Sequence, residues 1–350
     1  MVLFFKRIMA FAFMYSIGIF YGCMVFCRLI WSIIREGTVV VKSVPIEQAP
    51  TCLEDKNLGI HNYVTTKSKI TFHYVANGDV GQPLMLFLHG FPEFWYSWRY
   101  QLKEFCKDYR AVAVDLRGYG FSDKPEKTSL YKINYLAEDV KEIVEALGYT
   151  SCTLVGHDWG GLISWSVAHR FPEIVDKLVI LNCPHPKIFM NFLLSSWKQF
   201  LMCWYIFLYQ LPYLPELFIS LKKFRIIRAV FRGKYAGVRN TTNISDLDIE
   251  AFKFAISQPG ALTAALNYYR NVVTMYIDND WLKDGQPRVT APTLIVWGDQ
   301  DAFLLKKSLD FIPECVENST IRFVGGASHW VQQDEPQIVN DFIREFLESS

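Results

Sequence analysis

The chain has 350 residues and a formal net charge of +1 at pH 7, so it lacks the basic excess of a nucleic-acid-binding protein. Hydrophobic residues make up 51% and aromatic residues 16% of the chain, which excludes a disordered polypeptide and is high for a soluble domain. Eight cysteines occur without a Cys-x-x-Cys pair or a Cys/His cluster, so neither a zinc site nor a disulfide scaffold is expected.

The N-terminal segment carries much of the apolar excess. No charged residue occurs from Ile8 to Cys27, and basic residues flank this stretch on both sides. A helix over the stretch would be roughly 30 Å long, which matches the hydrocarbon core of a bilayer. A cleaved signal peptide is the alternative, but bulky residues continue to Ile34 without a small-residue cleavage site. We therefore predict an uncleaved transmembrane anchor in residues 1–36.

Beyond the anchor, residues 37–59 mix polar residues, prolines and valines and are expected to form a tether. Residues 60–77 alternate enough to predict a β-hairpin. Further strands are predicted at the apolar runs Leu84–Leu88, Ala111–Leu116, Cys152–Val155, Leu178–Leu181, Thr293–Trp297 and Ile321–Val324. These runs are largely continuous, which is typical of parallel strands buried on both faces, and helical patterns such as Tyr135–Leu147 lie between them. We predict an open, mostly parallel α/β sheet.

The strand spacing is interrupted between residues 185 and 288. This region is rich in aromatic residues and helix formers, so we predict a helical lid there. The lid would be inserted into an α/β core made of residues 60–184 and 289–350.

Asp158 lies at the centre of a predicted strand–turn–helix unit, in the sequence Gly156-His157-Asp158-Trp159-Gly160-Gly161. Small residues around one central side chain are typical of the nucleophile elbow of α/β-hydrolases. An aspartate that attacks an acyl carbon would form an anhydride, whereas one that attacks a saturated carbon forms an alkyl ester that water can hydrolyse. The motif therefore predicts displacement at saturated carbon.

Covalent hydrolysis also needs a base for water and an acid that orients the base. In this fold the chain order is nucleophile, acid, histidine. Asp301 follows the predicted strand Thr293–Trp297, and His329 follows the strand that ends near Val324. Both lie on loops at strand ends, where open α/β sheets bind ligands. Asp299 is an alternative for the orienting acid.

An oxyanion hole requires two backbone N–H groups. One is expected from Trp159, the residue after the nucleophile. The other is expected from Phe91, in the loop that follows the strand Leu84–Leu88 and reads His89-Gly90-Phe91-Pro92.

Four motifs together resemble the epoxide hydrolases of the α/β-hydrolase superfamily, over about residues 60–350: His89-Gly90-Phe91-Pro92-Glu93, Asp115-Leu116-Arg117-Gly118-Tyr119-Gly120, Gly156 to Gly161 and Ser328-His329-Trp330. The apolar N-terminus makes the chain most similar to the membrane-anchored epoxide hydrolase 4 and 3 branch. The resemblance implies hydrolysis of an epoxide to a vicinal diol through a covalent alkyl-aspartate, without a metal or organic cofactor. It also implies that Asp301 is the acid.

The resemblance further implies two lid tyrosines that hold the epoxide oxygen. Tyr205 matches one family pattern, in Tyr205-Ile206-Phe207-Leu208-Tyr209-Gln210-Leu211-Pro212, and Tyr269 matches the other, in Asn267-Tyr268-Tyr269-Arg270-Asn271. A phenol with a pKa of about 10 is a neutral donor at pH 7 and can protonate a developing alkoxide.

Two other functions were weighed against this one. A haloalkane dehalogenase shares the aspartate, histidine and acid, but it typically has an asparagine where Phe91 stands. A non-catalytic, membrane-tethered binding protein on the same fold would usually have lost Asp158, His329 or the acid. The aromatic lid suggests a lipophilic epoxide such as a fatty-acid epoxide, although a plain lid core would have the same composition: Phe192, Trp197, Phe200, Trp204, Phe207 and Phe218.

The orientation of the anchor depends on opposing signals. Basic residues are slightly more numerous after the apolar stretch than before it, which favours a cytosolic catalytic domain. Glycosylation sequons at Asn240, Asn243 and Asn318, and the resemblance to type II anchored relatives, favour a lumenal one. We expect a single-pass protein of the endoplasmic reticulum with the catalytic domain in the lumen.

Overall fold

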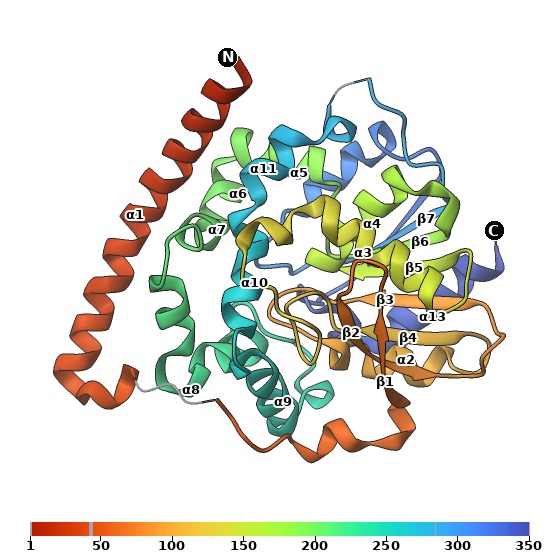
Figure 1. Cartoon of the computed structure of the whole chain (residues 1–350), viewed down its shortest axis with the longest axis horizontal. Coiled ribbons are helices and arrows are strands. Elements are labelled where there is room, and N and C mark those ends of the chain that lie inside the picture. Colours follow the sequence, from red (N-terminus) through yellow and green to blue (C-terminus); the bar gives the residue numbers. More distant parts are fainter. Residues whose placement is uncertain (1, 42–44, 284, 350) are drawn as a thin grey trace.

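An eight-stranded sheet forms the centre of the protein in a computed structural model, which describes residues 2–41, 45–283 and 285–349 (Figure 1). Its strand order is β1-β2-β4-β3-β5-β6-β7-β8. The strands are β1 (Ile60–Thr65), β2 (Thr71–Asn77), β3 (Leu84–Leu88), β4 (Arg110–Val114), β5 (Cys152–His157), β6 (Val175–Leu181), β7 (Thr293–Gly298) and β8 (Ser319–Val324). The predicted α/β-hydrolase sheet is therefore confirmed, and the observed strands overlap all the predicted runs.

The sheet is parallel except at one edge. Strands β1 and β2 pair antiparallel with each other, and β2 pairs antiparallel with β4, whereas β4, β3, β5, β6, β7 and β8 are parallel to one another. The central strands β3 and β5 are buried along their whole length. The expectation of burial on both faces is wrong for β8, because this edge strand exposes Arg322 and Phe323 to solvent.

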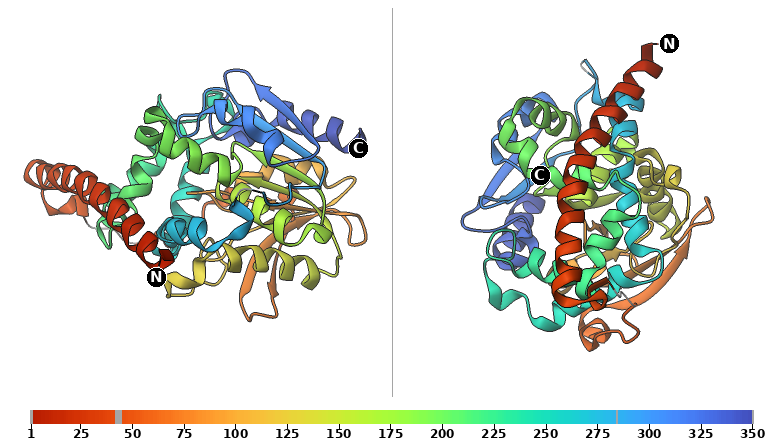
Figure 2. Two further views of the ribbon diagram at one scale, coloured as in Figure 1. Left: turned by 90° about the horizontal axis from the view of Figure 1, so that it is seen from above. Right: turned by 90° about the vertical axis from the view of Figure 1, so that its left-hand side faces the viewer.

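Helices cover both faces of the sheet (Figure 2). On one face α3 (Ile133–Ala146) packs against α4 (Trp159–Arg170), and on the other α13 (Pro336–Glu348) packs against α2 (Arg99–Phe105). The short helix α12 (Val331–Asp334) leads into α13. This layered arrangement leaves the carboxyl ends of the parallel strands as the edge where a site can form.

Between β6 and β7 the chain forms the region predicted to be a lid. Its helices are α5 (Pro186–Ser195), α6 (Trp197–Met202), α7 (Trp204–Leu208), α8 (Leu214–Arg232), α9 (Asp246–Ser257), α10 (Ala261–Arg270) and α11 (Val272–Asp278). Their packing is dominated by aromatic side chains, for example Phe200 against Phe207 with ring centroids 4.9 Å apart.

The N-terminal helix α1 (Val2–Glu36) lies along the outer side of the lid (Figures 1 and 2). One face is buried there, at positions three or four residues apart: Met14, Gly18, Gly22, Val25 and Leu29. Gly18 is essential to this contact, because a Cβ atom on it would lie 2.5 Å from the carbonyl oxygen of Phe207. By length and composition, Phe5–Glu36 is the one described helix that could cross a membrane. That α1 crosses the bilayer as a separate helix remains a prediction, because one of its faces is packed on the lid in the structure.

The segment predicted to be a tether also contacts the domain. Its described residues form short 3₁₀ helices, and Leu53 and Leu58 are buried in the hydrophobic core. Residues 42–44 of this segment lie outside the described part of the chain. The segment predicted to be a tether is therefore attached to the core by its few apolar side chains.

Candidate active site

Asp158 occupies a strained turn between β5 and α4. Its backbone has φ 50° and ψ −118°, a region that side chains other than glycine rarely adopt. The neighbouring glycines permit this turn, because a Cβ atom on Gly160 would lie 2.0 Å from the carbonyl oxygen of Leu88. The chain can therefore reverse direction directly above the sheet and present the aspartate at its carboxyl edge.

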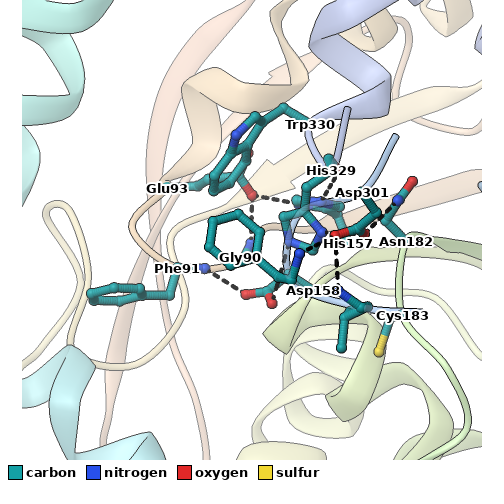
Figure 3. Close-up of polar contacts among 12 residues, drawn as sticks. Gly90, Phe91, Glu93, His157, Asp158, Asn182, Cys183, Asp301, His329 and Trp330 are labelled. Atoms are coloured by element: carbon teal, nitrogen blue, oxygen red, sulfur yellow. Dashed lines mark hydrogen bonds and ion pairs between the residues drawn. The ribbon is translucent and has the colours of Figure 1, made fainter. Parts of the chain in front are cut away.

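His329 lies between two carboxylates at this edge (Figure 3). Its Nδ1 is 2.7 Å from Oδ2 of Asp301, and its Nε2 is 3.6 Å from Oδ2 of Asp158. Asp299, the alternative acid, instead accepts the backbone N–H of Gly326 at 2.8 Å. The structure thus brings Asp158, His329 and Asp301 together and leaves Asp299 outside the group.

Asp301 is fixed by donors that the sequence analysis did not single out. Its Oδ1 accepts the backbone N–H groups of Phe303 at 2.7 Å and Leu304 at 3.0 Å. The side-chain amide of Asn182 donates to its Oδ2 at 2.7 Å. Asn182 directly follows β6 with φ 40°, a conformation that asparagine tolerates better than most residues, and this preference was the available signal.

The loop after β3 supplies a hydrogen-bond donor to Asp158. The backbone N–H of Phe91 donates to Oδ1 of Asp158 at 2.8 Å. Gly90 makes this approach possible, because a Cβ atom there would lie 2.5 Å from the Cβ atom of Asp158. Trp159 is the first residue of α4, where a backbone N–H has no partner within the helix. Both N–H groups expected in the oxyanion hole are therefore next to the Asp158 turn.

A second buried pair supports this arrangement from behind. Nδ1 of His157 is 2.7 Å from Oε2 of Glu93, and Nε2 of His157 is 2.9 Å from the carbonyl oxygen of His329. The same Glu93 oxygen accepts the backbone N–H of Gly90 at 2.9 Å. The pair therefore links the loop of Phe91 to the loop of His329. Glu93 and His157 belong to recognised motifs, but no role was predicted for either.

The charges at the centre favour an ion pair. Burial alone would raise the pKa of Asp158, but the hydrogen bond and charge of His329 and the N–H of Phe91 together lower it. Burial would likewise lower the pKa of His329, but the charge of Asp301 and the contacts with both carboxylates raise it to about 10. Both shifts therefore favour an imidazolium between two carboxylates before a substrate binds.

The two predicted tyrosines come from the lid and line the same cavities as Asp158. Tyr205 lies in α7 and Tyr269 in α10, with ring centroids 6.0 Å apart. Both line two cavities of about 60 and 110 Å³ that also contain Asp158. Burial first, and the charge of Asp158 in addition, raise the pKa of both phenols well above its usual value. Each is thus a neutral donor at pH 7.

A third tyrosine was quoted in the sequence motif but given no role. Tyr209 lines the larger of these two cavities, and its ring centroid is 5.0 Å from that of Tyr269. The rest of the lining is mostly apolar, with Phe303 and Trp330 next to His329. Among the described residues, no group of three or more His, Cys, Asp or Glu side chains could hold a metal ion.

Comparison with known proteins agrees with this fold and site. A family profile described as alpha/beta hydrolase fold matches residues 83–336. The chain is 43% identical to human epoxide hydrolase 4 over 91% of its own length and 88% of that protein. It is 44% identical to epoxide hydrolase 3 of Xenopus tropicalis, over 87% of this chain and 82% of that one.

A solved structure of an epoxide hydrolase is also similar to this chain. The epoxide hydrolase of Bacillus megaterium, crystallised with an inhibitor, superposes with a TM-score of 0.74 at 34% identity, covering 82% of this chain and all of that one. The chain therefore belongs to the α/β-hydrolase family and, within it, to the branch of epoxide hydrolases 4 and 3. It is a hydrolase.

Proposed function

We propose that this protein hydrolyses an epoxide to a vicinal diol through a covalent ester on Asp158. One observation carries the proposal, namely a carboxylate at the elbow that faces the His329–Asp301 pair on one side and two lid tyrosines on the other. A carboxylate nucleophile suits attack on saturated carbon, and neutral phenols suit a developing alkoxide. The names of the relatives support the same chemistry.

In the first step Oδ2 of Asp158 attacks an epoxide carbon, because Oδ1 is already held by the N–H of Phe91. The carbon–oxygen bond of the strained ring breaks, and the leaving oxygen takes a proton from Tyr205 or Tyr269. The products are an alkyl ester and a tyrosinate. The apolar cavity excludes competing water at this stage.

Formation of the ester changes the charge next to His329. The neutral ester removes one of the two carboxylates that raise the pKa of the imidazole, so this pKa falls. His329 can then release its proton, and the tyrosinate recovers one. His329 is thus a cation before Asp158 reacts, and it becomes a neutral base only after the ester has formed.

In the second step His329 takes a proton from water, which adds to the carbonyl carbon of the ester. Negative charge then develops on Oδ1, where the N–H groups of Phe91 and Trp159 stabilise it. In the collapse the ester C–O bond breaks and the departing alkoxide takes a proton from the imidazolium, which gives the diol. The carboxylic acid left on Asp158 then passes its proton to His329, and this restores a carboxylate beside an imidazolium. The sum is one epoxide and one water consumed for each diol, with no net proton change.

Isotope-labelled water tests this sequence in a single turnover with excess enzyme. We expect the label in the carboxylate of Asp158 and an unlabelled oxygen in the first diol. Direct appearance of the label in that diol would show attack by water on the epoxide and overturn the covalent route. Bromoalkanes serve as the comparison substrate, since faster turnover of these would identify a haloalkane dehalogenase.

We also propose that α1 attaches the protein to the membrane of the endoplasmic reticulum, with the catalytic domain in the lumen. Of the three sequon asparagines, Asn318 is exposed, whereas the side chains of Asn240 and Asn243 bond to the residues before α13. Loss of an endoglycosidase-sensitive mobility shift in Asn318→Gln would support lumenal exposure. Complete release by carbonate would contradict the anchor.

A further inference from the structure

A third cavity, which we call the anchor chamber, lies between α1 and the lid. It measures about 180 Å³, more than either cavity at Asp158. Its walls come from α1, α5, α6, α7 and α11, and every lining side chain is apolar except that of Tyr276. Such a space disfavours polar ligands, because their hydrogen-bonding groups would lose water without gaining a partner.

The anchor chamber shares a wall with the catalytic cavity. Val272 and Tyr276 of α11 line both the chamber and the cavity that contains Asp158, Tyr205 and Tyr269. The hydroxyl of Tyr276 donates to the carbonyl oxygen of Pro186 at 3.0 Å, which holds its ring in this wall. The two spaces therefore meet at the side chains of Val272 and Tyr276.

The far side of the chamber is closed by a helix whose outer surface is apolar. Phe5, Phe20 and Trp31 of α1 are each more than 60% exposed. In the adjacent α6, Trp197 is 72% exposed and stacks on Phe200 of the chamber wall. An apolar surface of this extent is suited to hydrocarbon.

Ion pairs hold the two ends of α1 on the lid. Arg7 pairs with Asp278 at the end of α11, and Glu36 pairs with Lys222 of α8, with 2.7 Å between the charged atoms. The middle of α1, which closes the chamber, is held by apolar contacts alone, among them Phe13 against Phe200. A hydrocarbon chain could replace these contacts without breaking an ion pair.

We propose that the anchor chamber binds the hydrocarbon tail of a lipid epoxide that enters from the bilayer between α1 and the lid, while the epoxide ring reaches Asp158. This proposal rests on the proposed epoxide hydrolysis and adds to it a second binding site, which lies outside the cavities at Asp158. The apolar walls, the shared side chains and the apolar surface outside the chamber point to the same occupant.

Two alanines of α1 provide a matched test. Ala10 lines the chamber, whereas Ala12 is exposed on the other side of the helix. We expect Ala10→Phe to lower the ratio of kcat/KM for methyl epoxystearate to kcat/KM for styrene oxide by about ten-fold, since the added ring fills the chamber. Ala12→Phe should leave the ratio unchanged. Equal ratios in both variants and the wild type would overturn the proposal.

A covalent experiment avoids any dependence on how Ala10→Phe folds. The full-length His329→Gln variant is treated with a long-chain epoxide that carries a diazirine at the end of its tail, and then irradiated. We expect the tail to label α1, or Val273 and Ile277 of α11, which line the chamber but not the cavities at Asp158. Labelling confined to residues of those two cavities or to other parts of the lid would overturn the proposal. If no ester forms on Asp158, or if the wild type hydrolyses no epoxide, the proposed function itself fails.

Discussion

The core and the lid position their parts of the site by different physical means. Asp301 in the core accepts three donors besides His329, and Asp158 is fixed by a strained turn and the N–H of Phe91. The lid tyrosines are held mainly by ring contacts, Tyr205 against Phe303 and Tyr269 against Trp159. The charged groups therefore lie on a hydrogen-bonded edge of the sheet, whereas the two lid phenols lie in an apolar layer held by ring packing.

The largest effect is expected from the charged centre. In His329→Gln the ester can form, but no base remains to activate water, so steady-state turnover should fall by about 10²–10⁴-fold. Mass spectrometry of the intact variant after exposure to styrene oxide should show an adduct of substrate mass on Asp158. Near-normal turnover would remove His329 from its proposed role, and the absence of any adduct would contradict the covalent ester on Asp158.

Paired substitutions test whether Asp301, and not Asp299, is the acid that orients His329. Asp301→Asn removes the negative charge next to Nδ1, so the imidazolium formed during water attack loses its partner and turnover should fall by about 10²-fold or more. Asp299→Asn is the matched control and should stay near the wild-type rate, since Asp299 contacts the Gly326 turn. The reverse order of effects would assign the acid to Asp299.

The lid donors should produce smaller and partly redundant losses. Tyr205→Phe and Tyr269→Phe each leave one phenol at the epoxide oxygen, so we expect each to lower kcat by about 10-fold. The double variant should lose more than the product of the two single effects, because no donor remains. Hydrolysis of the trapped ester should be little changed in all three, and a large change there would place the tyrosines in the second step.

The sequence predicted the strands and the Asp158 turn of the core more fully than the buried polar contacts around them, for a physical reason. The strands of the core are continuous apolar runs, and the elbow needs glycines around Asp158, so both are visible locally. Glu93, His157 and Asn182 were not assigned roles, because their partners lie far along the chain and only the folded sheet brings them together. A polar residue inside a buried network has the same local sequence signal as one at the surface.

The contact of α1 with the lid shows the same limit in an apolar setting. Ile8 to Cys27 has no charged residue, so no change in polarity marks which face of the helix is buried. Gly18 and Gly22 have the spacing of a packing face, yet such a pair is common in membrane helices. The carbonyl of Phe207 and the side chain of Leu211, which fill the space next to these glycines, are visible only in the structure.

The smallest predicted effect concerns stability, and it tests whether the core is held by the ion pair. The pKa of His329 is about 10 in the folded protein, above its usual 6.5. The imidazolium therefore contributes stability fully below pH 6.5, and this contribution is lost as the pH rises through about 10. The pKa of Asp158 is lowered, so its contribution is already complete at neutral pH and is lost only in acid.

Between pH 7 and 10, the wild type should consequently lose more thermal stability than His329→Gln, in which this titration is absent. We expect the difference in Tm between the two proteins to change by about 2–4 °C over this range. Thermal unfolding of both proteins in the same detergent at several pH values gives the measurement, and the comparison cancels the titration of lysines and tyrosines elsewhere. Parallel curves would mean that the charged centre serves the reaction and contributes nothing to the fold.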